Sequence, residues 1–238
     1  MKLSVLMPVF NEDEWVERVV AKVLRQRIDG IDAAEVILVD DASTDQTKTI
    51  IHKLIENYGE AIVPVYHERN LGKGAAIKSA VEHMSGDVCI IQDADLEYDP
   101  KEYPLMLEPI IAGYADCVYG SRFIGSQPKR VLFFWHFVGN SFLTILSNMF
   151  TNLNLTDMET GFKAFRGDIM RSIPIRTKGF GFEPEITAKI AQRKCRVYEV
   201  GISYQGRTYS EGKKINWIDG VKAIYYIIRF GLFDDSRK

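Results

Sequence analysis

Short apolar runs alternate with amphipathic segments through the first half of the chain. The runs are rich in Val and Ile and only four to seven residues long, which is typical of buried strands. Most segments between them repeat apolar residues three and four positions apart, which predicts helices. This alternation indicates an α/β fold with a mostly parallel central sheet and helices on both faces. The strands are predicted at residues 3–9, 36–39, 62–66, 88–91 and 115–119.

Polar residues follow four of the predicted strands, at positions 8–11, 40–41, 69–73 and 93–97. Because parallel strands end at the same edge of a sheet, and ligands bind beyond that edge, these clusters predict one shared site. Two of the helices that follow are predicted to begin with capping boxes, in which the first side chain bonds the helix amides. The pairs are Asn11 with Glu14 and Ser43 with Gln46.

The second half of the chain carries two aromatic-rich segments, residues 131–150 and 215–233. Polar residues interrupt both, as in helices that lie in a membrane interface with aromatic side chains near the headgroups. Packing of the aromatic residues in the protein core is the alternative. A late strand is predicted at 197–203, after a helix that begins near residue 183.

Composition narrows the classes of partner and compartment. The 238 residues carry a net charge of −2, which gives no overall attraction to nucleic acid. Three widely spaced cysteines fit reduced thiols of a cytoplasmic protein rather than a disulfide framework or a metal site. The first apolar run is too short for a signal peptide, and no uninterrupted apolar window of about 18 residues predicts a spanning helix.

The stretch VCIIQDADLEYDP, residues 88–100, places carboxylates directly after a buried strand. Asp93, Asp95 and Glu97 offer oxygen ligands on one loop, which suits Mg²⁺ or Mn²⁺ shared with substrate phosphates. A solvated turn is the alternative, because acidic residues often gather in turns. Lys73, between two glycines in NLGKGAA, is a candidate for contacting a phosphate, although it lacks the spacing of a Walker lysine.

Seven motifs occur in order along the chain: MPVFNE, VDDASTDQT, NLGKGAA, QDADLEYDP, GSRF, DMETGFKAF and GFGFEPEI. In this order they resemble the family 2 glycosyltransferases, and more closely the polyprenyl-phosphate (dolichol- or undecaprenyl-phosphate) mannose or glucose synthases within that family. The resemblance runs from about residue 3 to residue 230. It implies a GT-A fold, which is Rossmann-like, and inverting transfer of a hexose from a nucleotide sugar to a membrane lipid phosphate.

The resemblance also assigns the residues around the donor. Asp93 and Asp95 match the family's metal and diphosphate aspartates, and Glu97 stands where relatives often carry Gln, which also offers a metal ligand. Asp40 is expected near the base of the nucleotide. Together with Lys73, the residues expected to bind the nucleotide sugar are Pro8, Phe10, Glu12, Asp40 and Asp93.

Asp157, in TDMETGF, matches the position that the family often assigns to the catalytic base. A phosphate monoester has a second pKa of about 6 and is largely dianionic at neutral pH, so a strong base is not required. We therefore expect Asp157 to be a catalytic aspartate that orients the acceptor or the sugar. A helix N-cap is its alternative role.

An anionic acceptor requires cations. Arg122, just after a predicted strand, is expected to bind the acceptor phosphate and to act in catalysis, with Lys129 and Arg130 in the following loop. Arg207 and Lys213, on a loop flanked by glycines, are expected to close over the phosphates. For each of these except Arg122, a solvated surface charge is the alternative.

These expectations combine into one hypothesis. A GT-A catalytic domain spans residues 1–210, with 125–155 facing the acceptor and the membrane, and a C-terminal interfacial helix spans 211–238. The protein is expected at the cytoplasmic face of a membrane, bound peripherally, with room for a separate membrane-anchoring partner. The donor is UDP-glucose or GDP-mannose, with a preference for UDP-glucose.

Two alternatives stay open: a family 2 glycosyltransferase with a polysaccharide or other non-lipid acceptor, and a non-catalytic nucleotide-sugar-binding subunit. A dinucleotide-dependent oxidoreductase is a poorer hypothesis, because no G-x-G-x-x-G motif follows the first predicted strand.

Overall fold

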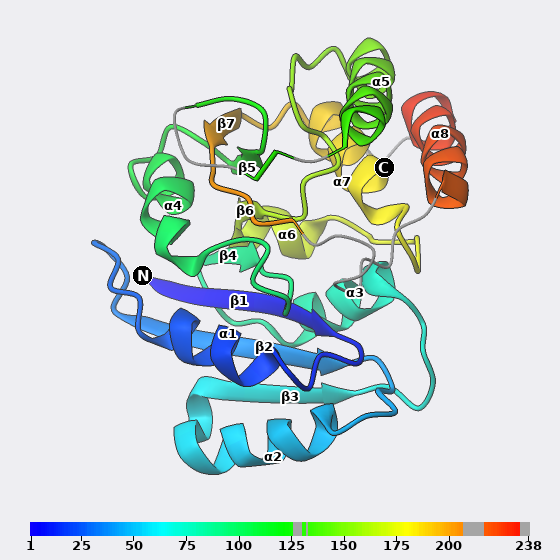
Figure 1. Cartoon of the computed structure of the whole chain (residues 1–238). Coiled ribbons are helices and arrows are strands. Elements are labelled where there is room, and N and C mark those ends of the chain that lie inside the picture. The colour runs from blue at the N-terminus through cyan, green and yellow to red at the C-terminus, as the bar shows by residue number, and fades with distance from the viewer. Residues whose placement is uncertain (126–129, 132, 207–216, 234–238) are drawn as a thin grey trace.

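The structure is a computed structural model that describes residues 1–125, 130–131, 133–206 and 217–233. Within these residues a seven-stranded sheet runs through the molecule in the order β3-β2-β1-β4-β6-β5-β7 (Figure 1). The strands are β1 Lys2–Val9, β2 Ala33–Asp40, β3 Ile62–Tyr66, β4 Val88–Ile91, β5 Cys117–Ser121, β6 Lys163–Arg166 and β7 Val197–Gly201.

Helices cover both faces of this sheet. They are α1 Val16–Leu24, α2 Thr47–Tyr58, α3 Lys73–His83, α4 Tyr103–Ile111, α5 Phe134–Thr151, α6 Gly167–Ser172, α7 Phe182–Gln192 and α8 Trp217–Leu232. Two short 3₁₀ helices are η1 Gly59–Ala61 and η2 Pro100–Glu102. Figure 1 shows α5 and α8 side by side at one corner of the molecule, and they contact each other and α7.

The sheet separates two apolar cores. Successive residues of a strand point to opposite faces, and in β2 Val36 and Leu38 join one core while Ile37 and Val39 join the other. Helices α1, α2 and α4 close the first core, and α3, α6 and α7 close the second. The buried runs recognised in the sequence are therefore strands covered on both sides, which fixes the carboxyl edge of the sheet.

The predicted mostly parallel α/β sheet is confirmed, with one addition. Strand β6 lies between β4 and β5 and runs antiparallel to both, while the other neighbouring strands are parallel. The sequence pattern does not predict β6, because it is four residues long and begins with Lys163. Its insertion brings residues 156–162, which precede it, beside the carboxyl ends of β4 and β5.

Neither predicted capping box forms. Helices α1 and α2 begin at Val16 and Thr47, and the residue before each makes no side-chain cap bond. Instead the backbone N–H of Asn11 donates to Ser43 Oγ (2.9 Å), and Asn11 Oδ1 accepts from the N–H of Thr44 (2.8 Å). The loops after β1 and β2 thus satisfy each other's polar groups across the carboxyl edge.

Cys89, Cys117 and Cys195 are free, and the first two are buried. Burial raises the pKa of Cys89 to about 12 and also raises the pKa values of Cys117 and Cys195. Because the thiolate is the reactive form, we expect at most about one thiol of the native protein to react with Ellman's reagent at pH 8 within minutes. All three should react after unfolding in guanidinium, and rapid labelling of two or more native thiols would contradict this burial.

Candidate active site

A buried glutamine fixes the loop that follows β4. The side-chain amide of Gln92 donates to the carbonyls of Asp93 (3.0 Å) and Tyr98 (3.3 Å), and its Oε1 accepts from the hydroxyl of Tyr103 (3.0 Å). Leu96 in the same loop has a positive φ of 58°. The predicted metal-binding carboxylates therefore lie on a turn whose backbone is fixed by hydrogen bonds to the buried side chain of Gln92.

Each of these carboxylates has a different partner. Asp95 Oδ1 accepts from the backbone N–H of Glu97 (3.1 Å), and Glu97 Oε2 accepts from the hydroxyl of Tyr204 (2.9 Å). Within the described part of the chain, His, Cys, Asp and Glu side chains form no group of three placed to hold a metal. Mg²⁺ commonly uses one or two carboxylates and completes its shell with water and substrate phosphates. The oxygen donors of Asp93 and Asp95 fit that kind of site.

Lys73 contacts the loop that carries the predicted metal ligands. Its Nζ lies 3.0 and 3.1 Å from the two oxygens of Asp93 and 3.2 Å from Glu183 Oε1. Burial lowers the pKa of Lys73, but the charges of Asp93 and Glu183 outweigh this effect and hold it above its usual range. The predicted phosphate ligand is thus a permanently charged ammonium group at the first position of α3.

The turn before Lys73 is held by the end of β2. Asp41 accepts the backbone N–H groups of Leu71 (2.8 Å) and Gly72 (2.7 Å), and its Oδ1 lies 2.6 Å from His67 Nδ1. Gly72 has a φ of 93°, and a Cβ there would lie 2.5 Å from a backbone oxygen of the loop before α7. This anchoring by Asp41 was not evident from sequence, because its three partners lie 26 to 31 residues away.

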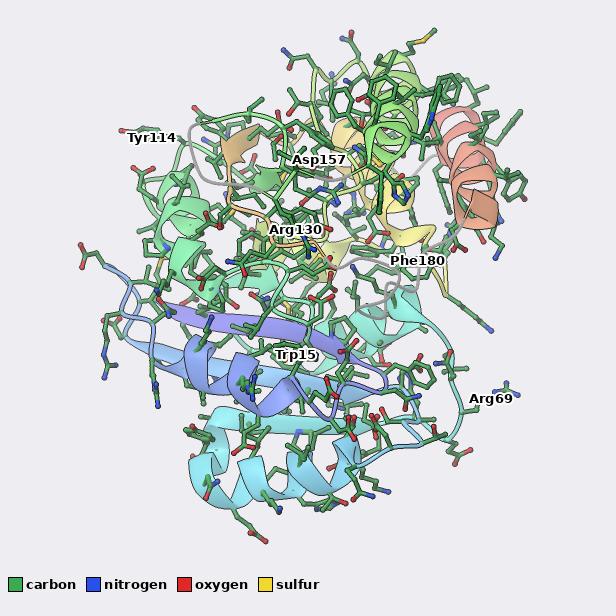
Figure 2. The ribbon with its side chains drawn as sticks, in the orientation of Figure 1. Trp15, Arg69, Tyr114, Arg130, Asp157 and Phe180 are labelled. Atoms are coloured by element: carbon green, nitrogen blue, oxygen red, sulfur yellow. The ribbon has the colours of Figure 1, made fainter. Side chains whose placement is uncertain are left out.

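Arg122 and Asp157 form the second half of the site. The guanidinium Nε and Nη2 donate to the two Asp157 oxygens at 2.6 and 2.7 Å, and the Arg122 backbone N–H adds a bond of 3.1 Å. Asn140, from α5, donates to Asp157 Oδ1 (3.1 Å) and accepts from Arg122 Nη2 (3.2 Å). Figure 2 draws Asp157 beside α5.

This geometry defines what Asp157 contributes. The residue is fully buried, lies in the loop between α5 and β6, and caps no described helix. Burial lowers the pKa of Arg122, but Asp157 outweighs it and keeps the guanidinium charged. Because both Asp157 oxygens accept bonds from Arg122, the arrangement favours orientation of the arginine over abstraction of a proton.

Tyr204 connects the two halves of the site and was not singled out from sequence. Its ring lies 5.2 Å below the guanidinium of Arg122, and its hydroxyl donates to Glu97. Its carbonyl accepts the backbone N–H of Arg130 (2.9 Å), whose Nη1 reaches the carbonyl of Gly206 (3.1 Å). The predicted acceptor ligand Arg130 (labelled in Figure 2) is thereby tied to the same tyrosine.

The residues predicted around the nucleotide lie at the carboxyl ends of β1 and β2. Pro8 is the penultimate residue of β1, and Phe10 and Glu12 follow that strand. The backbone N–H of Glu12 donates to Thr47 Oγ1 (3.0 Å), and Asp40 Oδ1 accepts from the N–H of residue 43 (3.0 Å). Strand β1 lies between β2 and β4, so this group occupies the same sheet edge as the carboxylate loop. Three predicted ligands lie outside the described residues: Lys129, Arg207 and Lys213.

Three buried titratable side chains were not identified from sequence: Glu159, Lys163 and Glu183. Burial, followed by repulsion from Glu183, raises the pKa of Glu159. Burial lowers the pKa of Lys163, which is fully buried and donates to the carbonyls of residues 158 and 160. Among the described residues, no donor reaches Glu159 Oε1 or Glu183 Oε2, although both atoms are buried.

Beside this site, α5 and α8 expose apolar side chains. On α5 the exposed fraction reaches 76% for Trp135 and 75% for Met149, and on α8 it is 58% for Tyr225 and 60% for Leu232. The exposed apolar residues of the two helices are Phe134, Trp135, Phe137, Val138, Phe142, Ile145, Met149, Val221, Tyr225, Ile228 and Leu232. Across the described residues, every helix is too short or too polar to cross a bilayer. We call this exposed surface the α5–α8 face.

Comparisons with known proteins find a family and relatives that match most of the chain. Residues 4–173 match the family described as Glycosyl transferase family 2. The chain is 29% identical to undecaprenyl-phosphate mannosyltransferase of Micrococcus luteus, over 98% of this chain and 95% of that protein. It is 26% identical to dodecaprenyl-phosphate galacturonate synthase of Rhizobium johnstonii over 90% of this chain, and it spans 62% of that longer protein.

Solved structures share the fold. The crystal structure of glucosyl-3-phosphoglycerate synthase from Mycobacterium tuberculosis superposes with a TM-score of 0.72 at 19% identity, covering 99% of this chain and 82% of that one. The same enzyme in complex with Mn²⁺, UDP and glucosyl-3-phosphoglycerate gives a TM-score of 0.68 at 20% identity, covering 99% and 81%. At these sequence identities the similarity to the solved structures shows only a shared fold. The predicted GT-A fold is thereby confirmed.

Proposed function

The chain belongs to glycosyl transferase family 2, and from that premise we propose that it transfers a hexose from a nucleotide sugar to polyprenyl phosphate at a membrane surface. The products are a polyprenyl-phosphate hexose and a nucleoside diphosphate. The family assignment alone does not name an acceptor. We propose a lipid phosphate as the acceptor because two relatives are named for undecaprenyl and dodecaprenyl phosphate.

One observation carries the choice of a lipid acceptor. Helix α5 supplies Asn140 to the Arg122–Asp157 pair, and the same helix exposes Trp135, Phe142 and other apolar side chains to solvent. Exposed apolar patches of this kind mark interaction sites, and aromatic residues are suited to the headgroup boundary of a bilayer. We infer that the α5–α8 face rests on the membrane surface, which brings the phosphate of the lipid to Arg122.

The proposed reaction needs no proton acceptor. One oxygen of the phosphate dianion attacks the anomeric carbon, the bond from that carbon to the diphosphate oxygen breaks, and its electron pair stays with the leaving diphosphate. Attack from the opposite side inverts the configuration. Arg122, held by Asp157 and Asn140, binds and orients the attacking phosphate.

We propose Asp93 and Asp95 as ligands of a divalent ion, Mg²⁺ or Mn²⁺, with Glu97 beside them. When bound, this ion neutralises charge on the departing diphosphate. Lys73 lies within 3.1 Å of Asp93 and is placed to bind the same phosphates. Pro8, Phe10, Glu12 and Asp40 line the adjoining sheet edge, where we propose that the nucleoside binds. Arg130, Lys129, Arg207 and Lys213 stay proposed phosphate ligands.

A glycine-to-alanine change tests how closely the donor site is packed. A Cβ on Gly161 would lie 2.5 Å from Asp93 Oδ2 and 3.2 Å from Lys73 Nζ. Because such an overlap costs about 1–3 kcal/mol, we expect Gly161→Ala to weaken binding of Mn²⁺ with a nucleoside diphosphate by about tenfold or more in calorimetric titrations. Gly179→Ala is the control, since a Cβ there meets nothing within 4 Å. Equal affinity of the two variants would contradict the proposed position of the donor phosphates.

The experiment that tests the function is a donor and acceptor screen. Purified protein is incubated with radiolabelled UDP-glucose or GDP-mannose, a polyprenyl phosphate in detergent, and Mg²⁺ or Mn²⁺. We expect labelled product in the organic phase from one donor, lost with EDTA and lost in Asp95→Ala. A labelled product that stays in the aqueous phase would contradict the lipid acceptor but would still show a glycosyltransferase. If a donor binds but no donor is turned over, the protein is instead a non-catalytic subunit that binds nucleotide sugars.

Membrane attachment has its own measurement. Co-sedimentation with liposomes should fall when Trp135 and Phe142 are both changed to Ser, because the exposed apolar area of α5 is reduced. Undiminished sedimentation would remove the α5–α8 face from the proposal. We propose that the protein binds the cytoplasmic face of the membrane, alone or together with a membrane-anchoring partner.

A further inference from the structure

Helix α8 packs against the start of α7 through a tyrosine ring. Gly181 is the residue before α7, and a Cβ on it would lie 2.4, 2.5 and 2.8 Å from the ring carbons Cδ2, Cε2 and Cγ of Tyr226. Carbon atoms in contact are normally about 3.5–4.0 Å apart, so the ring occupies the space that a Cβ would need. The φ of Gly181 is −83°, which any residue adopts. The packed ring, and not the backbone conformation, therefore requires glycine here.

Further contacts fix the position of α8. Phe230, one turn after Tyr226, is 1% exposed, and its carbonyl accepts a hydrogen bond from the side-chain amide of Gln192 on α7 (2.9 Å). The rings of Tyr226 and Phe230 stack with their centroids 6.0 Å apart. A Cβ on Gly231 would lie 2.7 Å from the Cβ of Phe150 on α5. Helix α8 is therefore closely packed against both α7 and α5 (Figure 1).

The loop before α7 is equally close to the turn that carries Lys73. A Cβ on Gly72 would lie 2.5 Å from the carbonyl oxygen of Lys178, and the backbone N–H of Ala75 donates to the same oxygen (3.0 Å). Lys73 lies between these two contacts, and its Nζ is 3.2 Å from Glu183 Oε1 in the first turn of α7. The position of the ammonium group of Lys73 therefore depends on where α7 begins.

We propose that Tyr226 is a positioning residue for the donor diphosphate. Its ring holds Gly181 and thereby the start of α7, which in turn holds Lys73 where it binds the phosphates. This inference rests on the proposed function, in which Lys73 contacts the diphosphate. A preorganised cation binds a phosphate more tightly than one that must first be ordered. Helix α8 then supports the donor site as well as exposing apolar side chains on the α5–α8 face.

Calorimetric titration of the protein with UDP, and in parallel with GDP, in the presence of Mn²⁺ tests the inference. In the series that the wild-type protein binds, we expect Tyr226→Ala to weaken binding by about fivefold or more, because the start of α7 loses its support. Tyr226→Phe should bind within about twofold of the wild type, because ring carbons make the contact. Equal affinities of the wild type and a folded Tyr226→Ala would overturn the inference.

Gly181→Ala tests the same contact from α7 and decides the question if Tyr226→Ala does not fold. Its Cβ displaces the tyrosine ring, so we expect binding to weaken by about threefold or more. Gly220→Ala is the control on α8, since a Cβ there meets no described atom within 4 Å. Equal affinities of these two alanine variants would contradict the positioning role.

A double-mutant cycle separates positioning of Lys73 from a general loss of structure. Lys73→Met removes the ammonium group. If Tyr226 acts through Lys73, adding Tyr226→Ala to Lys73→Met should weaken binding by less than about twofold further. Effects of the two substitutions that add in full would show that Tyr226 acts by another route, and the inference would be wrong. Failure of the wild-type protein to bind either nucleotide would instead overturn the proposed function.

Discussion

Replacing Asp157 with Asn is expected to lower kcat for sugar transfer by about 10²- to 10⁴-fold. The carboxylate accepts three bonds from Arg122 and one from Asn140. An amide at this position carries no charge and turns an NH₂ group towards the guanidinium, so Arg122 loses the orientation in which it binds the attacking phosphate. Steady-state kinetics with varied polyprenyl phosphate and saturating donor measure the effect, and the KM for the acceptor should rise as well.

Asp168 provides a matched control for this substitution. It also binds an arginine, with Arg166 Nη2 at 2.7 Å, but its side chain is 58% exposed and lies away from the site. Asp168→Asn should change kcat by less than about twofold, because exposed ion pairs contribute little. Thermal unfolding of both variants separates a catalytic effect from loss of folded protein. If Asp157→Asn keeps more than about half of the wild-type kcat while folded, the orienting role is wrong.

Replacing Glu185 with Ala is expected to lower the free energy of unfolding by about 3–5 kcal/mol. Glu185 and Lys189 form an ion pair one helical turn apart in which the two side chains are 1% and 0% exposed. Without the carboxylate, the ammonium group of Lys189 stays buried and loses its anionic partner, and the N–H groups of residues 176 and 177 lose their Glu185 acceptor. Urea denaturation followed by circular dichroism measures the loss.

Lys78 and Glu82 on α3 form the corresponding exposed pair, also four residues apart, at 3.9 Å with both side chains more than half exposed. Glu82→Ala should lower the free energy of unfolding by no more than about 0.5 kcal/mol, since solvent screens such pairs. The contrast between the two alanine variants isolates burial as the cause. Similar losses in both would show that the Glu185 network contributes little to stability.

The fold and one part of the site follow from local sequence patterns. Five strands are recognisable because each is a short apolar run between turn or helix signals, and parallel pairing then brings their carboxyl ends to one edge. Helix α3, which packs on β1 and β2, then brings Lys73 at its start to the loop of Asp93 and Asp95. The two predicted capping boxes do not form, because Asn11 and Ser43 form hydrogen bonds between the two loops rather than with their own helices. The local sequence does not predict this pairing, because the two residues are 32 positions apart.

Only the tertiary structure decides how the second half of the site is assembled. Arg122 and Asp157 are 35 residues apart in sequence, and Tyr204 is 107 residues from its partner Glu97. The antiparallel pairing of β6 with β5 brings Asp157 to Arg122, and the parallel pairing of β7 with β5 brings Tyr204 to the same edge of the sheet. The sequence by itself determined the family motifs, the sheet edge and the carboxylate cluster after β4, because these depend on neighbours along the chain. The pairing of charges and the two unpaired glutamate oxygens were decided by the fold, because burial and long-range partners fix which polar groups are satisfied.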